Sequence, residues 1–274
     1  MYILFDIGGT KMRFANSLDG KNLQTVEFHP TPQDFEKAIE IAQKYILNES
    51  LAHPENEFCV GLPGVFNEDK DSLVSAPNLP FWIGKPIKKR FMEISKSKVI
   101  LVNDAGLAAL GESIHGAGKN HKIVAYITIG TGIGGARVVD GKIDAARYGF
   151  EPGHQIISTS NSTEEILDWE GLVGGVGILK RYSKNPEEIT EKIVWDEINH
   201  YISIGLVNTI VHWSPDVVVL GGSVARNENV SIQKITEEIK KRLKVFPILP
   251  EIKKSSLGEE AGLFGGLAIL NIKD

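Results

Sequence analysis

Val99-Ile100-Leu101-Val102-Asn103-Asp104 is the stretch on which the predicted fold depends. Its first four residues are apolar and three of them are β-branched, which predicts a short buried strand. Residues 105–112 have a helical composition, so Asn103 and Asp104 stand where a strand ends and a helix begins. Two roles are open for Asp104. It caps the helix by accepting backbone N–H groups, or it faces a ligand at the edge of an open α/β sheet.

A glycine-rich turn near the start of the chain also follows a predicted strand. Residues 2–5 and 12–15 predict strands on either side of Asp6-Ile7-Gly8-Gly9-Thr10-Lys11. A hairpin turn alone explains the two glycines. It leaves Asp6, Thr10 and Lys11 unexplained, whereas a phosphate on the turn and a metal ion facing Asp6 account for all of them.

A second turn, Gly130-Thr131-Gly132-Ile133-Gly134-Gly135, repeats this pattern between residues 123–129 and 136–139. Its glycines also match the dinucleotide fingerprint G-x-G-x-x-G, but that fingerprint must open a helix. A strand is predicted after this turn, so we interpret it as a second phosphate-binding hairpin. The repetition predicts two related halves, each with its own phosphate-binding turn.

Three further segments carry candidate ligand-binding residues. Residues 75–82 form a loop in which Asn78 could meet a sugar hydroxyl, with plain irregular structure as the alternative. Glu151 and His154 lie in a turn rich in glycine and proline, where they serve hydroxyl recognition or the fold. Gly221-Gly222 follows a predicted buried strand, residues 216–220, and forms either a turn or a surface for a flat base.

Helices and loops are predicted from capping residues and apolar spacing. Thr31-Pro32-Gln33-Asp34 predicts a helix start with Thr31 as the cap. Apolar residues at helical spacing continue that helix through residues 35–46, and other helices are predicted at 194–213, 230–243 and 259–271. The polar residues 158–165 predict a loop.

Composition indicates an ordinary globular protein. The chain has 274 residues, enough for two domains, with 42% hydrophobic and 24% charged residues. Its net charge of −5 gives no reason to expect a nucleic-acid partner. The single cysteine, Cys59, lies in an apolar run, which predicts a packed core thiol. Because the sequence shows neither a signal-peptide pattern nor a membrane-spanning run, we expect a cytoplasmic protein with no membrane partner.

In this order, the motifs resemble those of the ROK family of sugar kinases, within the actin-like ATPase superfamily. The resemblance covers nearly the whole chain and rests on residues 6–11, 76–80, 103–105, 129–135, 151–154 and 219–222. It implies an α/β fold of two actin-like, ribonuclease-H-like domains with a central ligand cleft. We expect residues 1–107 plus 258–274 to form the domain on the sugar and phosphate side, and residues 108–257 to form the nucleotide domain.

The resemblance also implies roles for individual residues. Asp104 would be the general base that takes the proton from a sugar hydroxyl, and Asp6 would hold Mg²⁺ through water. The implied sugar contacts are Asn78, Asn103, Asp104, Glu151, His154 and Glu170. The implied nucleotide contacts are Gly8, Gly9, Thr10, Lys11, Gly130, Thr131 and Gly132 on the phosphates, with Gly221 and Gly222 as the adenosine wall.

One departure from the family concerns zinc. Many ROK proteins carry a C-x-C-G-x-x-G-C zinc motif soon after the turn that corresponds to residues 151–154, with the histidine as the fourth ligand. Residues 155–169 contain no cysteine in this chain. We therefore expect no structural zinc, and a His154 that serves only the sugar or the fold. The lack of an N-terminal helix-turn-helix segment speaks against the family's transcriptional repressors.

The activity implied is ATP-dependent phosphorylation of a hexose, most simply glucose to glucose 6-phosphate, with ATP and Mg²⁺ as cofactors. A fructokinase and an N-acetylhexosamine or N-acetylmannosamine kinase share the same motifs and stay open as alternatives. A sugar-sensing protein without catalysis is an alternative of another class, against which Asp6, Asp104 and both glycine turns speak. A homodimer is expected from the resemblance alone.

Overall fold

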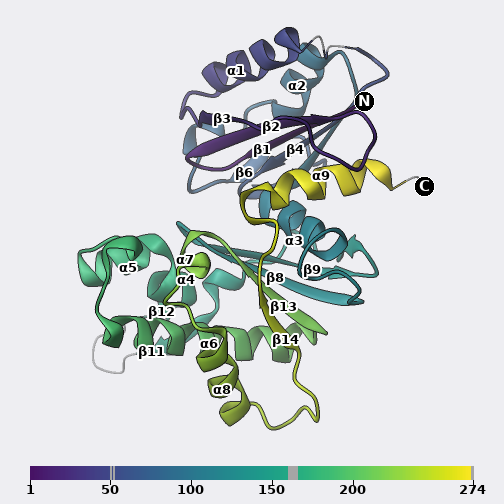
Figure 1. Ribbon diagram of the computed structural model, residues 1–274. Helices are drawn as coiled ribbons and strands as arrows, with labels where there is room; N and C mark the ends of the chain where they lie inside the picture. The colour runs from purple at the N-terminus through teal and green to yellow at the C-terminus, as the bar shows by residue number, and fades with distance from the viewer. Residues whose placement is uncertain (50, 52, 160–165, 273–274) are drawn as a thin grey trace. The chain divides into compact units, whose positions relative to one another are not determined.

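The computed structural model describes residues 1–49, 51, 53–159 and 166–272. It divides into two compact units. Unit 1 comprises Met1–Ile114, Ala145–Gly149 and Glu260–Asp274, and unit 2 comprises His115–Asp144 and Phe150–Glu259. Each unit is built on a five-stranded sheet with helices, which confirms the predicted class of two α/β domains (Figure 1).

The sheet of unit 1 has the strand order β3-β2-β1-β4-β7. Its strands are β1 (Tyr2–Ile7), β2 (Lys11–Ser17), β3 (Glu27–Pro30), β4 (Glu57–Leu62) and β7 (Val99–Asn103). The first three pair antiparallel, whereas β4 and β7 run parallel to β1. A small ladder of β5 (Val65–Phe66) and β6 (Leu73–Ser75) lies outside this sheet. The central strands are buried on both sides, which explains their continuous apolar runs.

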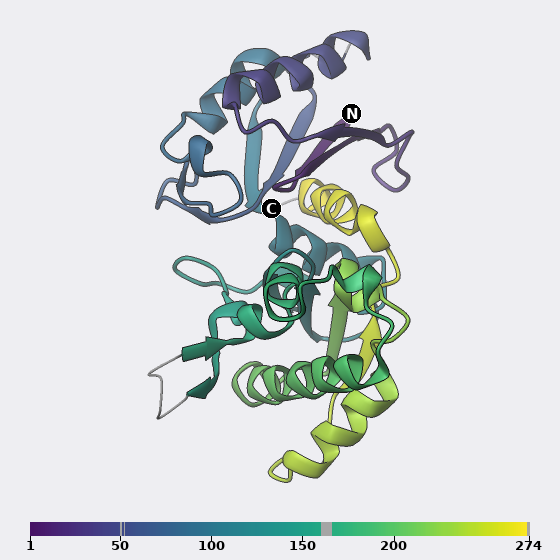
Figure 2. The ribbon, with the colours of Figure 1, turned by 90° about the vertical axis from the view of Figure 1, so that its left-hand side faces the viewer.

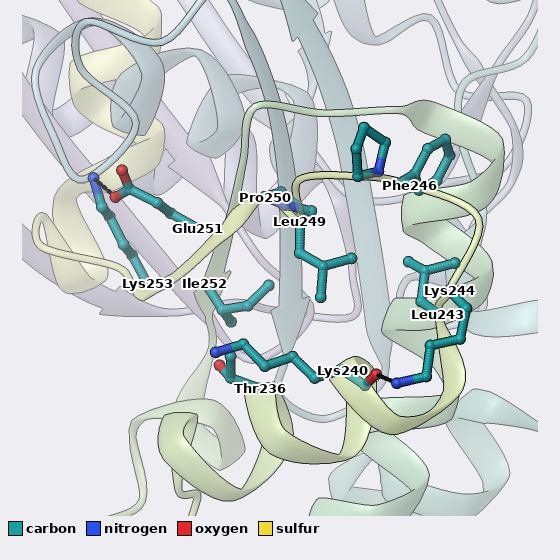
Figure 3. A pocket seen from close by; sticks show the side chains of 11 residues that line it. Thr236, Lys240, Leu243, Lys244, Phe246, Leu249, Pro250, Glu251, Ile252 and Lys253 are labelled. Atoms are coloured by element: carbon teal, nitrogen blue, oxygen red, sulfur yellow. Dashed lines mark hydrogen bonds and ion pairs between the residues drawn. The ribbon is translucent and has the colours of Figure 1, made fainter.

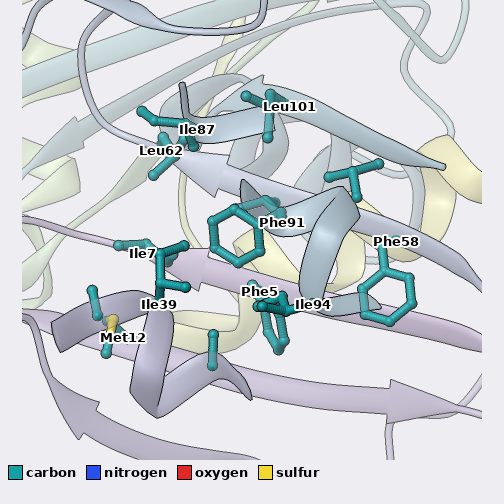
Figure 4. Packing of buried hydrophobic residues seen from close by; sticks show 14 of the residues in the cluster. Phe5, Ile7, Met12, Ile39, Phe58, Leu62, Ile87, Phe91, Ile94 and Leu101 are labelled. Carbon is teal, nitrogen blue, oxygen red and sulfur yellow. The ribbon is translucent and has the colours of Figure 1, made fainter. Parts of the chain in front are cut away.

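Two pairs of helices contribute to two separate apolar clusters of unit 1. Phe5 of β1 belongs to the cluster that includes α1 (Phe35–Asn48) and α2 (Ile87–Ser95), where it contacts the ring of Phe91 (Figure 4). The preceding residue of the strand, Leu4, belongs to the cluster with α3 (Asp104–Ile114) and α9 (Ala261–Asn271). This alternation follows from the two-residue period of a strand. Cys59 is buried in the second cluster, as the sequence predicted.

Helices α3 and α9 approach each other closely because glycines line their contact. A Cβ atom at Gly265 of α9 would overlap the carbonyl oxygen of Leu107, and one at Gly111 of α3 would overlap that of Ala261. The helix that begins at Asp104 is therefore held against the C-terminal helix backbone to backbone.

The predicted cap of α1 is corrected by the structure. Asp34, not Thr31, is the N-cap residue, and its side chain accepts hydrogen bonds from the backbone N–H groups of Glu36 and Lys37 at 2.9 and 3.3 Å. Thr31 instead donates its hydroxyl to the carbonyl of Gly8 at 2.7 Å. Both residue types cap helices well, so local pattern alone did not distinguish them.

Unit 2 repeats the strand pairing of unit 1. Its sheet has the order β10-β9-β8-β13-β14, with β8 (Ile123–Ile129), β9 (Ile133–Val139), β10 (Lys142–Ile143), β13 (Val217–Gly221) and β14 (Glu251–Lys254). Again the first three strands pair antiparallel and the last two run parallel to β8. In both sheets a glycine turn joins the first two strands of the unit, as the repeated motif predicted.

Helices of unit 2 pack on one face of this sheet. They are α4 (Trp169–Val173), α5 (Gly175–Tyr182), α6 (Lys192–Trp213), α7 (Ser223–Arg226) and α8 (Ile232–Arg242). Ile127 and Ile129 of β8 share an apolar cluster with Ile202 of α6, and α8 lies beside α6 (Figure 2). None of the helices among the described residues is both long and apolar enough to cross a membrane.

A short ladder in unit 2 corrects the loop predicted at residues 158–165. Strand β11 (Ile156–Thr159) pairs antiparallel with β12 (Ile166–Asp168), so Ser158 and Thr159 are in a strand. Residues 160–165 lie outside the described part of the chain. β-branched residues in this polar stretch were the signal that the loop prediction passed over.

Candidate functional site

Asn103 and Asp104 lie at the junction of β7 and α3 in unit 1, where their side chains make different contacts. The side-chain oxygen of Asn103 accepts the backbone N–H of Gly106 at 3.0 Å, and its amide donates to the carbonyl of Gly64 at 3.1 Å. Asn103 is therefore the residue that caps α3 from the end of β7. Asp104 is half-buried, and its carboxylate accepts the N–H of the adjacent Ala105 at 2.8 Å.

Asn78, which is distant in the sequence, packs against the first glycine turn. Gly8 closes the turn by donating its N–H to the carbonyl of Lys11 at 2.9 Å. A Cβ atom at Gly9 would lie 2.6 Å from the Cβ of Asn78, so only glycine lets Asn78 come this close. The side chains of Thr10 and Lys11 are exposed. Two groups of predicted ligand residues, Asn78 and the turn, thus share one surface of unit 1.

Asp6, the penultimate residue of β1, is nearly buried. It is 8% exposed, and the guanidinium of Arg13, its partner on β2, lies 3.3 Å from its carboxylate. A Cβ at Gly262 of α9 would lie 2.7 Å from the Asp6 Cγ, so the glycine makes room for this carboxylate. Mg²⁺ in nucleotide sites takes one or two carboxylates, waters and substrate phosphates. A single carboxylate beside a glycine turn fits that donor set.

The second glycine turn is fastened to the α4–α5 corner of unit 2. The carbonyls of Gly130 and Thr131 accept backbone N–H groups from Gly175 and Val176 at 2.7 and 3.1 Å. The Ile133 N–H donates to the carboxylate of Glu170 at 2.6 Å. These bonds fix the conformation of the turn. The side chain of Thr131 remains exposed.

Glu170 thus lies against the predicted phosphate turn. A Cβ at Gly132 would overlap the Glu170 carboxylate, so the glycine is required for this approach. The preceding residue, Trp169, is fully buried and donates its indole N–H to the Tyr201 carbonyl at 3.0 Å. Its ring packs where Gly205 of α6 carries no side chain. A buried anchor therefore holds the start of α4, and with it Glu170.

Glu151 is the N-cap residue of a short 3₁₀ turn, η2 (Pro152–His154), and His154 is its last residue; the turn packs on β9. A Cβ at Gly153 would lie 2.5 Å from the carbonyl oxygen of Ile133, which explains the glycine in this turn. Removal of water raises the pKa of the Glu151 carboxyl, although the residue is exposed; His154 opposes this rise and Glu170 adds to it. These three predicted residues influence one another electrostatically within unit 2.

Asp168 joins this group without having been predicted. Its carboxylate lies 3.1 Å from the His154 Nδ1 and raises the pKa of His154 through that hydrogen bond. The same carboxylate accepts the Gly171 N–H at 2.8 Å and caps α4. An acid directly before a helix was visible in the sequence as a capping signal, but its pairing with His154 was not.

The Gly221-Gly222 pair is explained by packing within unit 2. A Cβ at Gly221 would overlap the hydroxyl of Tyr126, and one at Gly222 would overlap the carbonyl of Ile129. Gly222 also has a φ of +89°, in the left-handed region that favours glycine. Both glycines are required by the contact of β13 with β8, so their predicted contact with adenosine stays a prediction.

A surface pocket of about 750 Å³ lies in unit 2 between α8 and β14 (Figure 3). Apolar side chains such as Phe246 and Leu249 line it together with Lys240, Lys244 and Lys253. None of the ligand-binding residues predicted from the sequence lines this pocket.

Two α/β units with matching strand pairing, each with a glycine turn between its first two strands, define a protein of the actin-like ATPase class. Residues 2–273 match the ROK family, and the chain belongs to this family of sugar kinases. The resemblance drawn from the sequence motifs is thereby confirmed.

Relatives of known name cover the whole chain. The N-acetyl-D-glucosamine kinase of Vibrio atlanticus is 27% identical over 310 residues, which span 100% of both chains. The crystal structure of a ROK hexokinase from Thermus thermophilus superposes with a TM-score of 0.81 at 26% identity, covering 100% of this chain and 99% of the other. A ROK family glucokinase from Streptomyces griseus, in complex with glucose and AMPPNP, has the same fold, with a TM-score of 0.82, 22% identity and 98% of each chain covered.

Proposed function

We propose that this protein is an ATP-dependent hexose kinase with Asp104 as its general base and glucose as the first substrate to test. The observation that carries the proposal is the capping of α3 by Asn103. Because Asn103 accepts the Gly106 N–H, the Asp104 carboxylate is not needed for that cap. The junction of a buried strand and a helix then gives Asp104 a rigid mount of the kind a catalytic base requires.

In the proposed reaction, Asp104 accepts the proton of a sugar hydroxyl while the oxygen of that hydroxyl bonds to the γ-phosphorus of ATP. The bond between that phosphorus and the bridging oxygen breaks, and ADP leaves. Backbone N–H groups of the glycine turns stabilise the charge on the phosphate oxygens. Mg²⁺, when bound with ATP, supplies further charge neutralisation, and Asp6 is the residue that would hold it through water.

The sugar hydroxyls are assigned to Asn78, Glu151 and His154, which present an amide, a carboxylate and an imidazole. For Asn103, both ends of the side-chain amide already bind backbone groups, so its role is chiefly to hold the junction. For Glu170, the contact with Ile133 adds a role in shaping the phosphate turn. We place such an enzyme in the cytoplasm, where ATP is abundant. Sedimentation of the full-length protein tests the expected homodimer.

An N-acetylhexosamine kinase is the second candidate. It is supported by the full-length similarity to N-acetyl-D-glucosamine kinase, whereas the similarity to a ROK hexokinase supports an unmodified hexose. Glucose and N-acetylglucosamine differ only in the group at one ring carbon, so an assay with both sugars decides between the two candidates.

A coupled assay of ADP release, run with ATP and Mg²⁺ over glucose, mannose, fructose, N-acetylglucosamine and N-acetylmannosamine, tests the proposal. We expect turnover with at least one sugar, and the ratio of kcat/KM values decides between the candidates. Sugar binding measured by calorimetry without turnover of any sugar would favour the sensor. If the protein neither binds nor phosphorylates any of these sugars, the kinase assignment is overturned.

A further inference from the structure

One carboxylate in unit 2 makes two contacts that bear on the proposed sugar site. Asp168 is the last residue of β12 and the N-cap of α4. One of its oxygens lies 3.1 Å from the Nδ1 of His154, and the other accepts the Gly171 N–H at 2.8 Å. It thereby joins the turn that carries His154 to the helix that carries Glu170.

Backbone hydrogen bonds around Asp168 hold it in place beside His154. The N–H of Trp169 donates to the carbonyl of Gln155 at 3.0 Å, and Asp168 stands opposite Ile156 in the β11–β12 ladder. The buried indole of Trp169 anchors the next position. The backbone on both sides of the pair is therefore held in register, which brings the His154 ring to the carboxylate.

Stability alone does not account for the pair. The side chains of His154 and Asp168 are 59% and 34% exposed. Ion pairs with this exposure contribute little to folding, because water screens them and side-chain entropy opposes them. What such a pair does well is to orient an imidazole and select its tautomer.

We propose that Asp168 is a positioning residue for sugar recognition, which acts through His154 and the start of α4; this inference rests on the proposed hexose kinase. With Nδ1 bound to the carboxylate, the neutral His154 ring carries its proton on Nδ1, and Nε2 is the nitrogen left for a sugar hydroxyl. The cap on Gly171 holds the first turn of α4, in which Glu170 follows Trp169.

Charges around His154 favour its protonated form. The hydrogen bond that His154 donates to the Asp168 carboxylate is the largest cause of its raised pKa, removal of water opposes the rise, and the carboxylates of Glu170 and Glu151 add to it. In its protonated form the ring donates from Nε2 to a hydroxyl, and in its neutral form it accepts there. Asp168 therefore sets the pH at which the sugar contact changes from donor to acceptor.

The test uses Asp168→Asn, because asparagine caps a helix as well as aspartate does but carries no charge. We expect kcat/KM for the sugar to fall by roughly tenfold, the lower end of what loss of an orienting partner costs. The change should lie mainly in the KM for the sugar, with the KM for ATP nearly unchanged. Asp34→Asn, the same substitution at the N-cap of α1, is the matched control and should leave both constants unchanged.

A second readout does not depend on turnover. In ¹⁵N NMR spectra of the full-length protein, the His154 ring, assigned with His154→Gln, should show the Nδ1–H tautomer and a pKa above that of an ordinary histidine. Asp168→Asn should lower that pKa and change the tautomer. An unchanged tautomer and pKa, or an equal loss of activity in Asp34→Asn, would overturn the positioning role. If the wild type phosphorylates no sugar, the kinase proposal fails while this spectrum still decides the role of Asp168.

Discussion

The Glu170 carboxylate accepts the backbone N–H of Ile133 at 2.6 Å and closes the predicted phosphate turn from the side of α4. A carboxylate on a backbone N–H makes a charge-assisted hydrogen bond, which is shorter and stronger than a neutral one. The contact links a residue assigned to the sugar with a turn assigned to the nucleotide. The proposed role of Glu170 in ATP binding can therefore be tested apart from its proposed role in sugar binding.

Loss of the Glu170 side chain should therefore weaken ATP binding. A hydrogen bond to a charged group contributes about 1.5–3 kcal/mol, so in Glu170→Ala we expect the KM for ATP to rise by about tenfold or more. Glu170→Gln keeps an oxygen that accepts from Ile133 and should show a smaller rise. Steady-state kinetics with varied ATP at saturating sugar measures both. An unchanged KM for ATP in Glu170→Ala would contradict the role of the contact.

Gly132→Ala provides an independent check of the same contact. The added methyl group overlaps the Glu170 carboxylate and should displace it, raising the KM for ATP. In the double variant with Glu170→Ala the overlap is gone, so the two effects should not add. Additive effects in this double-mutant cycle would show that Gly132 acts in some other way.

The assignment of Asp104 leads to a second prediction. Asp104→Asn keeps the shape of the side chain but accepts no proton, so we expect turnover to fall by roughly 10²-fold or more while sugar binding is retained. Single-turnover rates and calorimetric titration with the sugar measure the two quantities separately. Near-normal turnover would remove Asp104 from the chemistry.

The raised pKa of Glu151 predicts how activity depends on pH. Removal of water raises the pKa of this carboxyl, so the ionised form, which we propose accepts a sugar hydroxyl, is lost at a higher pH than for an ordinary glutamate. We expect kcat/KM for the sugar to decline as the pH falls through this raised pKa. Glu151→Gln should lower kcat/KM and remove that acidic decline. A decline that stays in place in Glu151→Gln would have to come from another group.

The packing of α3 on α9 predicts a stability difference between two neighbouring glycines. Gly265→Ala places a methyl group on the Leu107 backbone, which cannot move aside cheaply, and should destabilise the protein by about 1–3 kcal/mol. Gly266→Ala meets the Leu4 side chain at 3.1 Å, which can shift, so its cost should be smaller. Urea unfolding of both variants measures the difference. Equal destabilisation would contradict the close backbone contact.

Local patterns in the sequence determined the secondary structure near the site and the family. The strand Ile123–Ile129, the junction after residues 99–102 and both glycine turns follow from residue types read in order, because strand period and turn chemistry are local properties. Six short motifs in the right order then sufficed to identify the ROK family.

Only the tertiary structure decided which side chains work together. Glu170 meets Ile133 across 37 residues, His154 meets Asp168 across 14, and Gly9 makes room for Asn78. The choice of Asn103 rather than Asp104 as the cap of α3 belongs here as well, since it is fixed in part by the Gly64 carbonyl. Such pairings depend on the three-dimensional path of the chain between the two residues, which the types of those residues do not reveal.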